Sequence, residues 1–296
     1  MTETFAAQSQ EKTRFLQRVS RALRRLDPVA AVCLSFILVV VTAAVLADWL
    51  APHAFAEINL GARKLPPVFA GGDWNHPFGT DELGRDILSR LMFAARTSLL
   101  IALAAAAVSA VTGSLTGLLA GYRGGMVDSV IRVAIDFQAS MPFLIIALAV
   151  LAFLGNSLVL FVLLLGLHGW ERYARLVRAM TKLEMSKGYV RALERNGASS
   201  WRIVFHHVLP NVAPIMLVNF TVTLPELLLV ESGLSFLGLG VQPPLATLGN
   251  MVNFGRDYLI TDWWIATIPG VVIFLLALSI SMLGDWLRDV MDPTLR

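Results

Sequence analysis

The chain has 296 residues, 56% of them hydrophobic and 15% charged, and its mean hydropathy is +0.67. This composition is too apolar for an ordinary soluble domain and indicates a membrane protein. The net charge of +3 does not indicate a nucleic-acid partner, because the basic residues alternate with apolar runs and form no basic module with stacking aromatics. The one cysteine, Cys33, excludes an internal disulfide and a cysteine-based metal site.

Six segments are long and apolar enough to cross a bilayer, for which a helix needs about 20 residues. In chain order they cover residues 29–51, 98–120, 133–154, 157–170 with an extension toward 177, 208–230 and 264–283. Only Gly155 and Asn156 separate the third segment from the fourth, which predicts a tight αα-hairpin. The sequence thus predicts an all-α membrane protein with six transmembrane helices and both termini on the same side.

The distribution of lysine and arginine predicts which side is cytoplasmic. With the N-terminus inside, only six of the 24 basic residues fall in the outer segments, namely Arg63, Lys64, Arg85, Arg90, Arg96 and Arg256. The positive-inside rule therefore places both termini in the cytoplasm. The expected organisation is a basic cytoplasmic segment 1–28, a first transmembrane helix 29–51, an extracytoplasmic loop 52–97, a five-helix core 98–286 and a cytoplasmic tail 287–296. A cleavable signal peptide is the alternative at the N-terminus, but the first apolar run exceeds the usual h-region of about 7–15 residues, which favours an uncleaved anchor.

The sequence GTDELGRDILSRL near the end of the outer loop predicts a short amphipathic helix. Thr80 or Asp81 can cap it, and Ile87, Leu88 and Leu91 share one apolar face. Such a helix is expected to lie along the outer membrane interface and to lead into the second span.

The chain lacks the motifs of common catalytic sites. It has no G-x-x-x-x-G-K-[ST] phosphate loop and no H-E-x-x-H zinc motif, and the second glycine of the stretch from Gly233 to Gly238 comes one place too late for a G-x-S-x-G nucleophile elbow. His206 and His207 are adjacent rather than four residues apart, and the histidines and methionines form no recognisable ligand cluster. The sequence therefore predicts no catalytic residue, no metal site and no cofactor in this chain.

Residues 184–207 form a polar insert between two apolar runs, and they predict a helix outside the membrane. Tyr189, Val190, Leu193 and Gly197 share one face of that helix, and Gly197 allows a bend into a second helical piece over 199–208. Pro210 has no backbone N–H, so we expect it to begin the fifth span and to set the angle at which that span enters the membrane. A free apolar face is typical of a helix that docks on a cytoplasmic partner, whereas the alternative is a solvated basic loop that only maintains topology.

Three acidic residues in or near the predicted spans are candidates for a translocation pathway, because a charge in hydrocarbon is costly and usually faces water. They are Asp136, Glu226 and Glu231. Asp136 and Glu231 also lie near the expected membrane surfaces, where exposure to solvent alone would explain them. Pro142 and Pro225 are expected to kink their helices.

Five stretches of the sequence resemble the permeases of ABC importers. YVRALERNGASSWRIVFHHVLPN is similar to their coupling-helix motif, and HPFGTDELGRDILSRL, GLLAGYRGGMVD, ESGLSFLGLGVQPP and GDWLRDVMDPTLR are similar to the C-type subunit of the dipeptide, oligopeptide and nickel family. Where the motif has Glu-Ala-Ala this chain has Arg191-Ala192-Leu193, so a contact of that glutamate is not carried over. The resemblance implies a set of residues that couple the permease to an ATPase: Tyr189, Val190, Arg191, Ala192, Leu193, Gly197, Ala198, Arg202, His207, Leu209, Pro210 and Asn211.

The resemblance also implies the partners and the cargo. A sister permease would complete the pathway as a heterodimer in the bilayer of a bacterial inner membrane, two cytoplasmic ATPase subunits would bind ATP and Mg²⁺, and an extracytoplasmic solute-binding protein would deliver the solute. Di- or oligopeptides are the expected cargo, and nickel or a metal chelate is the alternative. Two other classes remain open: an ion-coupled secondary transporter, which would show duplicated halves and a central ion site, and a structural membrane protein, which would leave the insert without a role.

Overall fold

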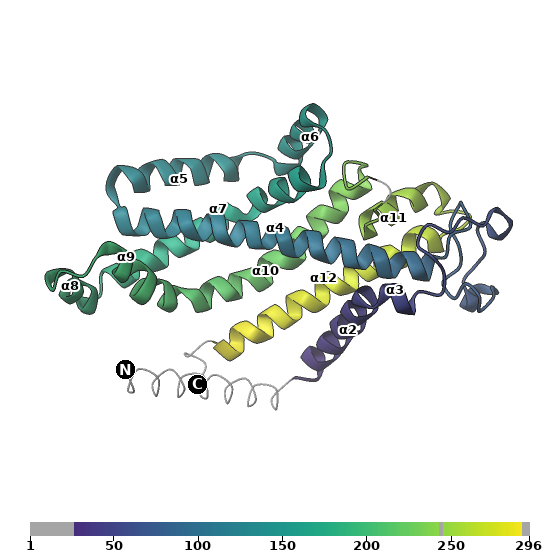
Figure 1. Ribbon diagram of the computed structural model, residues 1–296, viewed down its shortest axis with the longest axis horizontal. Helices are drawn as coiled ribbons and strands as arrows, with labels where there is room; N and C mark the ends of the chain where they lie inside the picture. Colours follow the sequence, from purple (N-terminus) through teal and green to yellow (C-terminus); the bar gives the residue numbers. More distant parts are fainter. Residues whose placement is uncertain (1–26, 243–244, 292–296) are drawn as a thin grey trace.

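The computed structural model describes residues 27–242 and 245–291 (Figure 1). Within these residues the chain is mostly helical, and its only β-type pairing is an isolated bridge between Thr80 and Asp86. The predicted N-terminal segment 1–28 lies almost entirely outside the described residues, as do Pro243, Pro244 and the end of the predicted tail 287–296.

The helices follow one another with short connections except for one long loop over residues 51–86. In chain order they are α2 (Pro28–Val45), α3 (Ala47–Leu50), α4 (Ile87–Arg123), α5 (Gly125–Ser140), α6 (Phe143–Leu154), α7 (Leu158–Met185), α8 (Gly188–Arg195), α9 (Ser200–Arg202), α10 (Leu209–Phe236), α11 (Leu248–Gly255) and α12 (Trp264–Met291). A π-helical segment, Ile203–Val208, joins α9 to α10, and single 3₁₀ turns lie at Leu60–Ala62, Val68–Ala70 and Arg256–Tyr258.

Four helices of the described chain are long and apolar enough to cross a membrane: α2, α4, α12 and the continuous helix Ser200–Phe236, which contains α10. The pair α5 and α6 would form a fifth crossing by the same criteria. α7 is not among them, since Glu171, Arg172 and Arg175 lie close together in its middle. α8 lies at one end of the molecule, and the loop 51–86 and α11 lie at the opposite end (Figure 1).

The short interfacial helix predicted before the second span is not a separate element. Ile87 and Leu91 belong to the first turns of α4, which continues without a break through the whole predicted span. Its N-cap is Asp86 rather than Thr80 or Asp81, and the Asp86 carboxylate accepts a hydrogen bond from the N–H of the third helical residue at 2.7 Å. No proline interrupts α4 and its first 26 residues include no glycine, so nothing ends the helix between the interface and the span.

The third span, predicted as one helix over 133–154, is broken in two. α5 and α6 are bent by 89° relative to each other. Pro142 lies at the break: it cannot donate a backbone hydrogen bond, and it disfavours a helical conformation for Met141, which is extended with φ −96° and ψ 133°. The turn predicted at Gly155 and Asn156 is present, because α6 ends just before this pair and α7 begins two residues after it.

Glycines on α4 allow close packing against α7. Gly113, Gly117 and Gly121 are spaced four residues apart and lie on the face of α4 that meets α7. A Cβ added at Gly113 would lie 2.3 Å from the carbonyl oxygen of Trp170, and one added at Gly117 would lie 2.7 Å from that of Ala174. This spacing of small residues is typical of transmembrane helices whose backbones approach closely.

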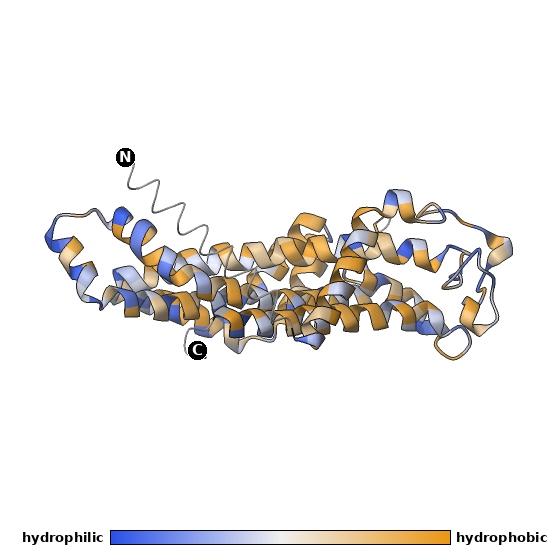
Figure 2. Ribbon diagram, turned by 90° about the horizontal axis from the view of Figure 1, so that it is seen from below, coloured by the Kyte–Doolittle hydropathy of each residue, from blue (hydrophilic) through white to orange (hydrophobic). Residues whose placement is uncertain are grey.

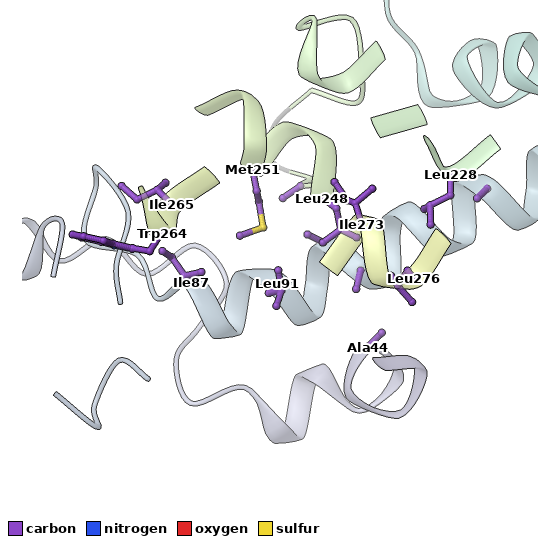
Figure 3. Packing of buried hydrophobic residues seen from close by; sticks show 14 residues of the cluster. Ala44, Ile87, Leu91, Leu228, Leu248, Met251, Trp264, Ile265, Ile273 and Leu276 are labelled. Atoms are coloured by element: carbon purple, nitrogen blue, oxygen red, sulfur yellow. The ribbon is translucent and has the colours of Figure 1, made fainter. Parts of the chain in front are cut away.

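A buried apolar cluster joins α2, α4, α10, α11 and α12 near the loop end of the molecule (Figure 3). Its labelled members are Ala44, Ile87, Leu91, Leu228, Leu248, Met251, Trp264, Ile265, Ile273 and Leu276. Elsewhere many large apolar side chains are exposed, among them Phe153 at 89% and Val159 at 69%. Hydrophobic residues prevail along the helices between the two ends of the molecule (Figure 2). Such extended apolar surfaces are expected to contact lipid or other membrane subunits.

Candidate functional site

The polar insert folds into the helix that the sequence predicts. α8 ends in a Schellman motif, in which the N–H of Gly197 donates to the carbonyl of Glu194 and the N–H of Ala198 donates to that of Leu193, both at 3.0 Å. Gly197 has φ +76°, a left-handed conformation that residues with a Cβ adopt only at a cost. The bend predicted at Gly197 is therefore confirmed, and it turns the chain from α8 toward α9.

The apolar face of α8 packs against the chain itself. Val190 is fully buried, and Leu193 and Ala198 are partly buried beside it. They contact a cluster formed by Leu118, Val177, Ile203, Val204, Val208 and Val212. The fold therefore buries Val190 within this face, while Tyr189 and Gly197 stay exposed and Leu193 is partly exposed.

The face of α8 that remains accessible is mainly polar. Arg191, Ala192, Glu194 and Arg195 are exposed, and Tyr189 is 38% exposed. Any partner of α8 therefore meets a mainly charged surface that also presents Ala192 and Tyr189.

A buried carboxylate connects α8 to the two long helices that flank it. Glu184, at the end of α7, accepts hydrogen bonds from Lys187 Nζ at 2.5 Å, Tyr189 Oη at 2.9 Å and Asn211 Nδ2 at 3.3 Å. Asn211, in the first turn of α10, also lies 3.2 Å from Tyr189 Oη. We name Glu184, Lys187, Tyr189 and Asn211 the polar latch, because they join the end of α7, the start of α8 and the start of α10.

The pKa values within the polar latch follow from these contacts. Burial alone would raise the pKa of the Glu184 carboxyl, but the hydrogen bonds from Lys187, Tyr189 and Asn211 outweigh burial and lower it. Burial, together with the hydrogen bond to Glu184, raises the pKa of the Tyr189 phenol. Glu184 is therefore ionised and Tyr189 neutral near pH 7, which is the combination that this hydrogen bond requires.

Pro210 lies in the first turn of α10, as the sequence predicts. The segment before it is helical too, so the chain enters α10 within one continuous helix from Ser200 to Phe236. Just before the proline the helix is π-wound: the N–H of Leu209 donates to the carbonyl of Val204, five residues earlier. The wider turn accommodates a residue that lacks an N–H and whose ring crowds the preceding turn. In the same segment His207 is partly buried and Arg202 is exposed.

The three acidic residues predicted for a pathway lie in different environments. Asp136 on α5 is exposed, with its carboxylate 3.8 Å from Arg175 of α7. Glu226 on α10 is partly exposed and forms a bidentate ion pair with Arg172 of α7, and His168 Nε2 lies 3.5 Å from its carboxylate. The structure therefore brings Asp136 and Glu226 each to an arginine of α7, but it does not join all three acids in one site.

Glu231 faces no aqueous path within this chain. It is fully buried, and its carboxylate accepts hydrogen bonds from the hydroxyls of Ser98 at 3.1 Å, Ser232 at 3.3 Å and Ser235 at 2.8 Å. Ser98 in turn accepts the N–H of Leu248 at 3.0 Å. The prediction of Glu231 as a pathway residue is corrected, because the carboxylate cross-links α4, α10 and the start of α11.

Two clusters of charged or potentially metal-binding residues were not predicted from the sequence. Asp128 of α5 is buried and pairs with Arg178 and with Lys182 Nζ, the latter at 2.7 Å, so it joins α5 to α7. The only signal for it was its place in the stretch GLLAGYRGGMVD. His53, His76 and Asp86 form the second cluster, at the end opposite α8, which contradicts the expectation that no histidines gather in a ligand cluster.

Comparisons with known proteins give the family. Residues 113–296 match the family described as binding-protein-dependent transport system inner membrane component, and residues 14–67 match the N-terminal TM domain of oligopeptide transport permease C. The chain is 39% identical over 264 residues to the di/tripeptide transport system permease protein DppC of Pseudomonas aeruginosa, covering 89% of this chain and 87% of that protein. It is 35% identical to the probable D,D-dipeptide transport system permease protein DdpC of Escherichia coli, over 98% of this chain and 96% of that protein.

Among solved structures, an inward-facing conformation of the MetNI methionine ABC transporter covers 68% of this chain and 97% of its own, with a TM-score of 0.49 and 23% identity. The family match spans more than half of the sequence, and the relatives extend it over nearly the whole chain. This assignment decides against the secondary transporter and the structural protein considered above. The chain belongs to the family of binding-protein-dependent transport system inner membrane components, and it is a multi-pass permease subunit of an ABC importer.

Proposed function

We propose that this permease imports di- or oligopeptides and that α8 transmits the movement of cytoplasmic ATPases to α10. The relatives are named as dipeptide or peptide permeases, which supports a peptide cargo. The polar latch is the observation that carries the coupling role. It joins α8 to the first turn of α10, and Val190 packs the helix against the buried apolar cluster beside it.

The proposed topology has six crossings with both termini in the cytoplasm. They are α2, α4, the bent pair α5 and α6, α7, α10 and α12, and successive members of this series run in opposite directions along the molecule (Figure 1). Arg172 on α7 is paired with Glu226, which supports burial of this helix in a membrane complex. The exposed arginines of α8 support a cytoplasmic position for its end of the molecule, by the positive-inside rule.

The proposed complex contains a sister permease, two ATPase subunits that bind ATP and Mg²⁺, and an extracytoplasmic solute-binding protein. The polar outer face of α8 would meet an ATPase, and the loop 51–86 with α11, at the opposite end, would face the binding protein. The pathway would lie between the two permeases. Asp136 and Glu226 are candidates to line it, because both are accessible in this chain.

A charge reversal on α8 tests the coupling role without removing the helix. Arg191→Glu with Arg195→Glu inverts the accessible face and leaves Val190 and the polar latch intact. Arg256→Glu is the matched control, because Arg256 is also exposed but lies on the 3₁₀ turn at the opposite end of the molecule. The permease is co-expressed with its native neighbours, purified in detergent, and assayed for bound ATPase, bound sister permease and peptide-stimulated ATP hydrolysis.

Two results decide the proposal. Loss of the ATPase from the α8 variant, with the sister permease retained and the Arg256 control unchanged, would support α8 as the coupling element. Retention of the ATPase with full peptide-stimulated hydrolysis in the α8 variant would refute that role.

A further inference from the structure

Three potential metal ligands converge at the end of the molecule opposite α8. His53 follows α3, His76 lies late in the loop 51–86, and Asp86 caps α4. One ring nitrogen from each histidine and one carboxylate oxygen of Asp86 all lie within 4.8 Å of one another. The two imidazole rings are stacked with centroids 4.6 Å apart. Residues 33 positions apart in the sequence are thus gathered at the N-terminus of one long helix.

The contacts around these side chains fix their orientation in the way that metal ligands usually require. The Nε2–H of His53 donates to the carbonyl of Asn75 at 2.9 Å in the tautomer that keeps the lone pair on Nδ1. Asp86 uses Oδ2 to accept both the N–H and the hydroxyl of Ser89, each at 2.7 Å, which leaves Oδ1 toward His76. His53 is therefore held through Nε2 and Asp86 through Oδ2, and each directs its other polar atom, Nδ1 or Oδ1, toward the cluster.

The separation of one pair of these atoms fits a tetrahedral ion. His76 Nδ1 lies 3.1 Å from Asp86 Oδ1, at hydrogen-bond distance. Two ligand atoms bound at about 2.0–2.1 Å in a tetrahedron lie about 3.3 Å apart, which is close to this separation. Glu57 Oε2 lies 3.7 Å from His53 Nδ1, so it neighbours the cluster but is not a member of it. Two imidazoles and one carboxylate, with a water molecule as the fourth ligand, suit Zn²⁺ better than Mg²⁺ or Ca²⁺, which prefer oxygen ligands alone.

We propose that His53, His76 and Asp86 bind one Zn²⁺-like divalent transition-metal ion that fastens the loop 51–86 to the start of α4. The ion joins three separate segments, so its binding orders the loop. The site is structural in this proposal and takes no part in moving the cargo. It depends only on residues of this chain.

Zinc binding by the purified importer complex is the test, with the permease free of any histidine tag. The metal-stripped complex is equilibrated with Zn²⁺, the bound metal is counted by mass spectrometry, and its affinity is measured by competition with a chromophoric chelator. The variants are His53→Gln, His76→Gln and Asp86→Asn. Asp86→Asn is the mildest of them, because asparagine still caps α4. His206→Gln is the matched control, since His206 is an exposed histidine at the α8 end.

We expect one Zn²⁺ per permease chain in the wild type and in His206→Gln, with at least about tenfold weaker binding in each cluster variant. We also expect Zn²⁺, but not Mg²⁺, to slow amide hydrogen exchange in residues 51–86 of the wild-type complex. This second measurement needs no variant and serves if a histidine substitution prevents folding. Absence of stoichiometric Zn²⁺ from the wild type, or equal affinity in the cluster variants and His206→Gln, would overturn the proposal.

Discussion

The close packing of α4 on α7 leads to a sharp prediction about glycine substitutions. We expect Gly113→Ala and Gly117→Ala to destabilise the permease, although alanine is the better helix former. Gly233→Ala is the matched control, because Gly233 also lies inside a long helix, α10, but a Cβ there would meet no atom within 4 Å.

The expected loss of stability follows from the distances between the added Cβ and its neighbours. Ordinary van der Waals contact of a Cβ begins near 3.4 Å, whereas a Cβ at Gly113 would lie 2.3 Å from the Trp170 carbonyl oxygen and 2.4 Å from the Tyr173 Cβ. These atoms cannot rotate away, so α4 and α7 would have to separate by about 1 Å. Overpacking of this kind costs about 1–3 kcal/mol, and the helix propensity of alanine returns about 1 kcal/mol. The net expectation is a loss of up to about 2 kcal/mol at Gly113 and a gain of up to about 1 kcal/mol at Gly233.

Thermal unfolding of the purified permease in one detergent would measure the difference. A gap of about 2 kcal/mol between Gly113→Ala and Gly233→Ala corresponds to a difference in Tm of about 3 °C for a chain of this size. The amount of each variant in the membrane is an independent readout, and we expect it to rank the variants in the same order as their Tm values. Equal Tm values for the two variants would refute the reasoning that the α4–α7 contact depends on the missing side chains.

Four further predictions concern the candidate site. Tyr189→Phe keeps the ring but removes the hydroxyl of the polar latch, so we expect faster amide exchange over α8, a local loss of at most about 1 kcal/mol and reduced transport; unchanged exchange would argue against the latch. Gly197→Val meets no neighbouring atom but strains a left-handed residue by about 1–2 kcal/mol, so transport should fail with the protein still in the membrane, and normal uptake would exclude a need for this bend. Arg172→Glu should impair the permease and Glu226→Arg in the same chain should restore it in part, as measured by Tm and uptake; equal damage in the double variant would contradict the ion pair. Glu231→Ala should lower Tm by more than Glu231→Gln, because it leaves buried serine hydroxyls without an acceptor at about 1–3 kcal/mol each, and a change in cargo preference with unchanged Tm would return Glu231 to the pathway.

The positions of the helices were largely predictable, but their continuity was not. Hydropathy located every long helix, and Gly155, Pro142 and Gly197 each mark an actual turn, break or bend. A hydropathy window does not show where a helix continues beyond the membrane, so α4 and α10 both extend past the predicted ends of their spans. Pro210 marks the first turn of α10 as predicted, but the sequence did not show that the residues before it are π-wound and make one continuous helix with α10.

The chemistry of the site was less predictable, because it depends on which helices become neighbours. The residues of α8 are contiguous in sequence and were found, but the burial of Val190 depends on α4, α7 and the segment before α10. Glu184 and Asn211 are 27 residues apart and became partners only through the fold. In the sequence Glu231 is an acidic residue within an apolar run, as a residue that lines a pathway would be. Only its hydrogen bonds to three serines in the folded chain show that it links helices instead.

The helix Ser200–Phe236 is suited to carry a displacement from α8 into the membrane. At about 1.5 Å per residue its 37 residues extend about 55 Å, and near its start it contacts the polar latch through Asn211. Farther along it is tied to α7 through Glu226 and to α4 and α11 through Glu231. Three residues of α10 are prolines, which have no backbone N–H to donate, so the helix can bend locally while its ends remain fixed. On the coupling role proposed for α8, its displacement would act on the Arg172–Glu226 pair before it reached the fully buried Glu231, so we expect that pair to change between two states of the importer.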